Sequence, residues 1–199
     1  LLLPRADVAI DRKARLGDFG SLLPYHTHVD AHDVVAGLNR LIDDANAGRR
    51  VFFDIYTDAE KKDDSTKGDT GVSFLRGRPG APFAVIAPGG GFSYVATVHE
   101  GLPYALAINR HGYNAFVLRY RVGLGGAAAT DDMAAALSTI FRNAATLQVS
   151  TEDYSLWGSS AGARMAAAIG SRSAASAGAI VPPKPTAVVM AYTGHSDTS

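Results

Sequence analysis

Apolar runs and amphipathic stretches alternate along most of this chain, and their lengths predict the elements of its fold. Short, nearly continuous apolar runs predict strands at residues 51–56, 72–75, 83–87, 115–120, 154–157 and 187–191. Between the later strands, apolar residues at three- and four-residue spacing predict helices at 103–111, 131–147 and 161–174. Strands that are apolar throughout and alternate with helices are typical of an α/β fold, with a mostly parallel sheet and helices on both faces.

The first 50 residues have a different pattern. Residues 1–30 are irregular and contain several proline and glycine breakers. A helix is predicted from Asp30 or Asp33 to about Ala47, with Gly48 as its stop. Its apolar face is formed by Val34, Val35, Leu38, Leu41, Ile42 and Ala45. We expect residues 1–50 to form an N-terminal extension, which either covers a site as a partial lid or packs against the sheet edge.

The composition suits one globular domain with its own core, since 47% of the 199 residues are hydrophobic and 19% are charged. Nineteen basic and 19 acidic residues give a formal net charge of zero, which indicates neither a nucleic-acid surface nor binding to an anionic membrane. No apolar stretch approaches the roughly 20 residues of a membrane span. The absence of cysteine excludes disulfides and thiolate chemistry, but it leaves the compartment open, cytoplasmic or secreted.

A Gly-x-Ser-x-Gly motif follows the strand predicted at 154–157. Residues 158–162, which we call the nucleophile elbow, read Gly-Ser-Ser-Ala-Gly and precede an alanine-rich helix. A serine at a sharp turn between a strand and a helix exposes its hydroxyl for attack on a carbonyl carbon, provided that the residues two before and two after it lack bulk. The motif alone also arises by chance in a chain rich in glycine and serine, so its setting matters. Ser160 is the candidate nucleophile.

A triple glycine follows the strand predicted at 83–87. Residues 88–92, which we call the glycine loop, read Pro-Gly-Gly-Gly-Phe. Glycines let backbone N–H groups face one point, and such groups stabilise the negative charge that acyl transfer builds on a carbonyl oxygen. The alternative is a phosphate-binding turn. The chain has no Gly-x-x-x-x-Gly-Lys-Ser/Thr element, however, and the glycine loop does not fit Gly-x-Gly-x-x-Gly.

Together, the two motifs and their neighbours resemble the α/β-hydrolase superfamily, in its esterase/lipase branch. The matching residues lie within 82–192 and are the glycine loop (with Pro88 where the branch often has His), Tyr120-Arg121, Asp131-Asp132 and the nucleophile elbow. The resemblance implies Ser160 as nucleophile. It also implies the N–H groups of Gly90, Gly91 and Ala161 as oxyanion-hole donors.

A base and an acid for Ser160 are not evident in the chain. The family order is Ser, then Asp or Glu, then His, on loops after two further strands, and only 39 residues follow Ser160. His195 and Asp197 are weak candidates, because at a separation of two residues one does not easily orient the other. We therefore hypothesise that residues 51–199 are the N-terminal portion of an α/β-hydrolase domain, incomplete at the C-terminus. The remainder would be a separate fragment or chain, or a stretch outside this sequence.

Three residues after the triple glycine are candidate substrate contacts. Phe92 and Tyr94 are placed to line an acyl or alcohol pocket, with ordinary packing beneath the loop as the equal alternative. His99 is placed to touch substrate, although a histidine at a helix start is more often structural or solvated.

A histidine cluster near the N-terminus has a spacing that suits a metal ion. Its members are His26, His28 and His32. Further ligands are not evident nearby, so we favour a solvated turn over a metal site. We expect no metal and no organic cofactor.

The function that these features predict is that of a serine hydrolase, which cleaves a small-molecule carboxylic ester through an acyl-enzyme on Ser160. Two alternatives remain. An amidase or peptidase of the same fold would use the same chemistry. A non-catalytic α/β-hydrolase-like binding protein would explain why no base is evident.

Overall fold

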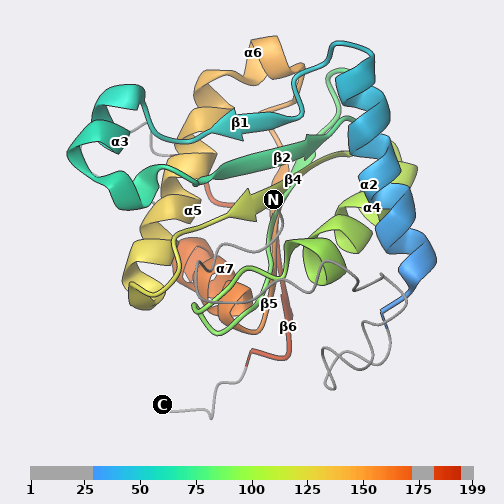
Figure 1. Cartoon of the computed structure of the whole chain (residues 1–199). Coiled ribbons are helices and arrows are strands. Elements are labelled where there is room, and N and C mark those ends of the chain that lie inside the picture. The colour runs from blue at the N-terminus through green and yellow to red at the C-terminus, as the bar shows by residue number, and fades with distance from the viewer. Residues whose placement is uncertain (1–28, 172–181, 194–199) are drawn as a thin grey trace.

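A computed structural model describes residues 29–171 and 182–193, and a six-stranded sheet forms the centre of this part of the chain (Figure 1). The strands lie in the order β1-β2-β4-β3-β5-β6. Their bounds are β1 Phe52–Asp54, β2 Gly71–Leu75, β3 Phe83–Ala87, β4 Asn114–Arg119, β5 Tyr154–Ser159 and β6 Ala187–Ala191. β2 pairs antiparallel with β1 and β4, whereas β4, β3, β5 and β6 pair parallel. The predicted α/β class with a mostly parallel sheet is therefore confirmed.

Helices cover both faces of the sheet, as the sequence predicts (Figure 1). α2 (Ala31–Asn46) and α4 (Leu102–Arg110) lie on one face, and α5 (Gly125–Arg142) and α7 (Ala161–Ser171) lie on the other. Two separate clusters of buried apolar side chains fill the two layers between helices and sheet. Among the described residues, no helix has the length and apolar character needed to cross a membrane.

The middle of the sheet is its most deeply buried part, because helices cover it from both sides. All five residues of β3 are buried, and so are five of the six residues of β4. Aromatic side chains fill the α5 side, where Phe74 and Phe116 stack with ring centroids 4.2 Å apart and Phe83 meets Phe116 edge-on. The carboxyl ends of β3 and β5 therefore lie side by side on a rigid base, which is where the two glycine motifs begin.

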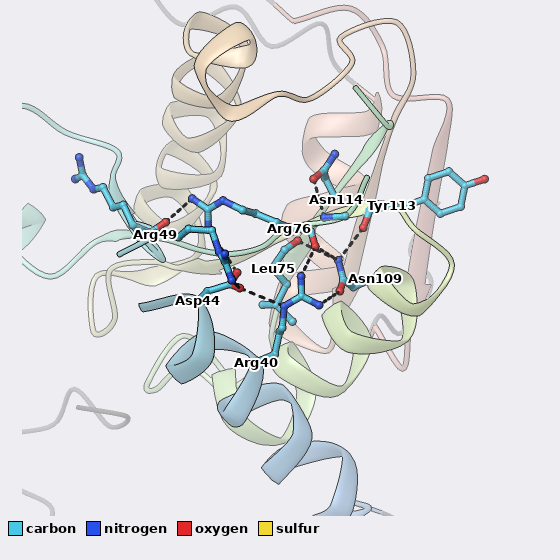
Figure 2. A network of polar contacts seen from close by, with 10 residues as sticks. Arg40, Asp44, Arg49, Leu75, Arg76, Asn109, Tyr113 and Asn114 are labelled. Carbon is cyan, nitrogen blue, oxygen red and sulfur yellow. Dashed lines mark hydrogen bonds and ion pairs between the residues drawn. The ribbon is translucent and has the colours of Figure 1, made fainter. Parts of the chain in front are cut away.

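A polar network holds the C-terminal half of α2 against the sheet (Figure 2). Asp44 is 1% exposed, and its Oδ1 accepts hydrogen bonds from Arg49 Nη2 at 2.6 Å and from Arg40 Nε at 3.4 Å. Arg40 also donates to the Arg76 carbonyl oxygen at 2.8 Å and to the side chain of Asn109 on α4 at 3.1 Å. The helix of the N-terminal extension is thus anchored to α4 and to the chain just after β2.

Three differences from the sequence prediction concern helices. The helix predicted at 131–147 begins six residues earlier, at Gly125, because the alanines that follow the glycine pair are strong helix formers, and it ends at Arg142 before the short α6 (Ala144–Leu147). Between β1 and β2 lies a short helix that the sequence analysis does not predict, α3 (Asp58–Asp63), which Thr57 and Glu60 start with a capping box. A π-helical turn, Thr97–Gly101, precedes α4.

Candidate active site

The nucleophile elbow joins the end of β5 to the start of α7. Ser160 has a φ of +51°, in the left-handed region that non-glycine residues seldom occupy. A Cβ on Gly158 would lie 2.3 Å from the carbonyl oxygen of Gly162, and a Cβ on Gly162 would lie 1.8 Å from that of Ala87. The Ser160 N–H donates to the carbonyl oxygen of Ala191 on β6 at 2.9 Å. Two obligatory glycines and a bond to the neighbouring strand therefore hold Ser160 in a strained turn.

The glycine loop turns sharply at the end of β3. Gly90 and Gly91 have φ values of +128° and +61°, and a Cβ on Gly90 would lie 2.0 Å from the Tyr94 carbonyl oxygen. The hydroxyl of Tyr120, just after β4, donates to the carbonyl oxygen of Gly89 at 3.1 Å. The turn thus needs glycine for its conformation, and a side chain from the next strand fixes its first part.

A buried carboxylate lies between the two motifs. Glu100 is 4% exposed, and its Oε2 accepts hydrogen bonds from the Gly89 N–H and from the Ser159 hydroxyl, each at 2.6 Å. Gly89 is enclosed on two sides, because a Cβ there would lie 2.8 Å from this oxygen and 3.0 Å from the Cβ of Ser160. The loop, the carboxylate and the candidate nucleophile therefore meet around Gly89.

A cavity of about 840 Å³ opens beside the nucleophile elbow. Ser160, Gly90 and Gly91 all line it. Asp30, the N-cap of α2, and Asp33, in its first turn, line the same cavity, so the N-terminal extension contributes to its wall. The candidate nucleophile and the glycine loop thus line one cavity, and its volume fits a small molecule.

Three tyrosines, Tyr94, Tyr104 and Tyr192, give the cavity an aromatic wall with polar tips. Burial raises the pKa of Tyr94 and of Tyr104, and the nearby charge of Glu100 raises both further. Partial burial likewise raises the pKa of Tyr192, and the nearby Glu100 carboxylate raises it further. All three phenols therefore stay uncharged at neutral pH.

Comparison with known proteins identifies the fold. No protein-family model and no curated protein matches the chain, but solved structures do. The α/β hydrolase MGS-M1, from a Medee basin deep-sea metagenome library, is 27% identical, with a TM-score of 0.53 over 61% of this chain and 51% of that one. A sugar hydrolase from Lactococcus lactis is 28% identical, with a TM-score of 0.51 over 61% and 48%. The chain has the α/β-hydrolase fold.

An acetyl ester-xyloside bifunctional hydrolase from Caldicellulosiruptor lactoaceticus shares this fold at 22% identity, with a TM-score of 0.59 over 70% of this chain and 55% of that one. The chain spans about half the length of the solved α/β hydrolases that it matches. The resemblance that the sequence motifs indicated is thus confirmed for the fold.

Within the α/β-hydrolase fold of this chain, most of the predicted site residues lie together. Ser160, Gly90, Gly91, Tyr94 and His99 all line the cavity, although the nucleophile elbow lies about 70 residues after the glycine loop and the two residues that follow that loop. The adjacent parallel strands β3 and β5 bring them there. Their chemical roles remain predictions.

Two predicted residues lie elsewhere. Ala161 is buried and begins α7, where the first N–H groups of a helix have no partner within the helix, as an oxyanion donor requires. The ring of Phe92 packs edge-on against Tyr120 at 6.3 Å and next to Gly126. Phe92 is not among the cavity residues, so the structure favours packing beneath the loop over the predicted substrate contact.

The structure gives no support to the remaining candidates for the base, the acid and a metal site. His195 and Asp197 lie outside the described residues, as do His26 and His28. His32 belongs to α2. Within residues 29–171 and 182–193, no group of three or more potential ligands could hold a metal ion.

Among the cavity residues that sequence reasoning missed are Glu100, Tyr104 and Tyr192. The available signal for Glu100 is that it is the only acidic residue between Asp69 and Asp131. Such a residue is seldom buried unless it is paired. Tyr192 follows the last predicted strand directly, at the end of the sheet where the two motifs lie.

Proposed function

We propose that this chain supplies the nucleophile and the oxyanion hole of a serine hydrolase that cleaves carboxylic esters. The proposal rests on one observation: Ser160 has a strained backbone and lines the same cavity as Gly90 and Gly91. Strain of this kind persists only where the surroundings enforce it, and it clusters at active sites. The enclosing contacts of the nucleophile elbow supply that enforcement here.

In the proposed reaction, the Ser160 oxygen attacks the ester carbonyl carbon while a base takes the hydroxyl proton. The N–H groups of Gly90, Gly91 and Ala161 stabilise the resulting oxyanion, and each well-aimed donor contributes about 3 kcal/mol. The carbon–oxygen bond to the alcohol then breaks, and the alcohol leaves with the proton. Water attacks the acyl-enzyme by the same route, which releases the carboxylic acid and restores the serine.

The base and its acid are proposed to come from outside the described residues. They are either His195 and Asp197 or groups in a further part of the protein, on the same chain or on a separate fragment. The order of the motifs in this fold favours the second source.

The cavity favours a small or medium-sized ester. Its volume of about 840 Å³ lies within the range of ordinary small-molecule sites. Aromatic rings with uncharged hydroxyls suit both apolar and hydroxyl-bearing groups of a substrate. Tyr94 and Tyr104 are proposed as contacts, with His99 beside them.

Labelling with a fluorophosphonate tests the proposal on the full-length protein. We expect covalent labelling of Ser160, found by peptide mass spectrometry, and no labelling of Ser160→Ala. Ser171→Ala, which removes an exposed serine at the end of α7, is the matched control and should label normally. Unlabelled wild-type protein would instead support the non-catalytic alternative.

A substrate panel separates esters from amides. We expect turnover of short-chain p-nitrophenyl esters and little turnover of aminoacyl anilides. The reverse preference would support an amidase or peptidase, with the same nucleophile.

A further inference from the structure

We infer that Glu100 is a positioning residue, whose carboxylate locks the glycine loop to the nucleophile elbow. The inference rests on the proposed function, and it assigns a role to a residue that neither motif contains. Glu100 acts through the two motifs, and its own contacts are to the residues that precede the reacting groups.

One carboxylate oxygen makes both connections. Oε2 of Glu100 accepts the N–H of Gly89, which directly precedes Gly90, and the hydroxyl of Ser159, which directly precedes Ser160. Both distances are 2.6 Å, the short separation of hydrogen bonds to an ionised carboxylate. A single atom thus sets the spacing between the candidate oxyanion donor and the candidate nucleophile.

The segment that carries Glu100 is itself fixed in place. Gly101 packs against β4, because a Cβ there would lie 2.4 Å from a methyl carbon of Val117. Within the π-helical turn, the Glu100 and Gly101 N–H groups both donate to the Ala96 carbonyl oxygen. The Ala96 N–H in turn donates to the Gly89 carbonyl oxygen at 3.0 Å. The turn that aims the carboxylate is therefore tied to the loop that the carboxylate holds.

The deep burial of the Glu100 carboxylate is unusual. A carboxylate that is only 4% exposed is seldom found without hydrogen-bond donors, and Glu100 accepts from a backbone amide and a serine hydroxyl. On the far side of the loop, the Tyr120 hydroxyl donates to the carbonyl oxygens of Pro88 and Gly89. The loop is therefore held by an acceptor on its N–H side and by a donor on its carbonyl side.

The chemical consequence concerns the transition state. Oxyanion donors act only when they lie about 3 Å from the position that the developing negative charge will occupy. A loop released from the elbow would still admit the substrate, but its N–H groups would be less well aimed. Loss of Glu100 should therefore lower kcat and leave KM nearly unchanged.

Three variants and a control test this in the full-length protein. Glu100→Ala removes both hydrogen bonds and should lower kcat on a short-chain p-nitrophenyl ester by about 10²- to 10³-fold, the usual effect of a lost oxyanion donor. Glu100→Gln keeps an oxygen that can accept both bonds and should stay within about tenfold of wild type. Ser159→Ala removes one bond, and its kcat should lie between those of the other two.

Asp44→Asn is the control for stability, since Asp44 is an equally buried carboxylate at the distant network of α2 (Figure 2). It should lower the unfolding midpoint and leave kcat within about twofold. Glu100→Ala with wild-type kcat, or with a rise in KM in place of a fall in kcat, would overturn the inference.

A second measurement does not depend on turnover. Hydrogen–deuterium exchange of the peptide that contains the glycine loop should be faster in Glu100→Ala than in wild type, and unchanged in Asp44→Asn. Unchanged exchange in Glu100→Ala would overturn the inference. If wild-type protein neither labels nor turns over, the proposed function fails, and this exchange experiment still decides whether Glu100 holds the loop.

Discussion

Gly162 in the first turn of α7 lies so close to Ala87 at the end of β3 that a Cβ on Gly162 would stand 1.8 Å from the Ala87 carbonyl oxygen. This contact seats α7 directly on the strand that leads into the glycine loop. The nucleophile elbow and the glycine loop are therefore packed together through backbone as well as through Glu100.

Gly162→Ala should consequently lower the free energy of unfolding by more than about 2 kcal/mol, because the added methyl meets backbone that has no room to retreat. Urea unfolding followed by circular dichroism measures this. Gly68→Ala is the control, since its Cβ would meet a single oxygen, that of Ser65, at 3.2 Å. Similar losses for the two variants would contradict the close seating of α7.

Ser160 provides a test of backbone strain that is separate from chemistry. Ser160→Gly and Ser160→Ala both remove the hydroxyl, so both should lose fluorophosphonate labelling. Since φ is +51°, the glycine variant should be more stable than the alanine variant by about 1 kcal/mol. Thermal unfolding of the pair decides the matter, and an alanine variant at least as stable as the glycine variant would mean that the turn is relaxed.

Asp132 should be far more important to stability than its neighbour Asp131. Asp132 is fully buried and accepts the Tyr56 hydroxyl at 2.6 Å, the Arg121 N–H at 2.6 Å and the Arg121 guanidinium at 2.9 Å. Asp132→Ala leaves these donors without an acceptor and should cost about 3–5 kcal/mol in unfolding free energy. Asp131 is exposed, so Asp131→Ala should cost less than about 0.5 kcal/mol. Equal urea midpoints for the two variants would refute this role of Asp132.

Tyr154 should make stability sensitive to alkaline pH. Burial raises the pKa of Tyr154 from 10.0 to about 12, and its hydroxyl donates to the Pro183 carbonyl oxygen at 2.6 Å. The folded state holds the proton more tightly than the unfolded chain, so the contribution of Tyr154 is complete below about pH 10 and is lost as the pH rises toward about 12.

The measurement is the unfolding free energy of wild type and of Tyr154→Phe across this alkaline range. The difference between the two should shrink as the pH rises, because phenylalanine has no proton to lose. A difference that stays constant with pH would show that the Tyr154 phenol does not titrate in this window.

Much of the fold follows from the sequence, because its strongest signals are local. The strands 83–87 and 187–191 have the predicted bounds, and Asp30 caps α2 as one of the two predicted starts. The predicted start of α5 at residue 131 was wrong, because the alanines after the glycine pair at 125–126 favour helix and extend it toward the N-terminus. The antiparallel direction of β2 depends on pairing with β4, which no local pattern encodes.

The candidate site, like the fold, was predictable from sequence only where the signal is local. Ser160 and the glycine loop carry their own motifs, and the structure brings them to one cavity. The role of Glu100 could not be assigned from sequence, because its contacts with Gly89 and Ser159 depend on a π-helical turn and on residues that lie 11 and 59 positions away in the chain. The ring of Phe92 turns toward Gly126, a residue whose lack of a side chain matters only once the chain has folded.

The two ends of α2 make different contacts, and this offers a route to redesign of the cavity. Asp30 and Asp33 face the cavity, whereas Asp44 lies about three turns away, roughly 16 Å along the helix, among the arginines that secure it. Libraries that vary the first turn can therefore alter which molecules are admitted, while the far end keeps the scaffold intact for every member of the library.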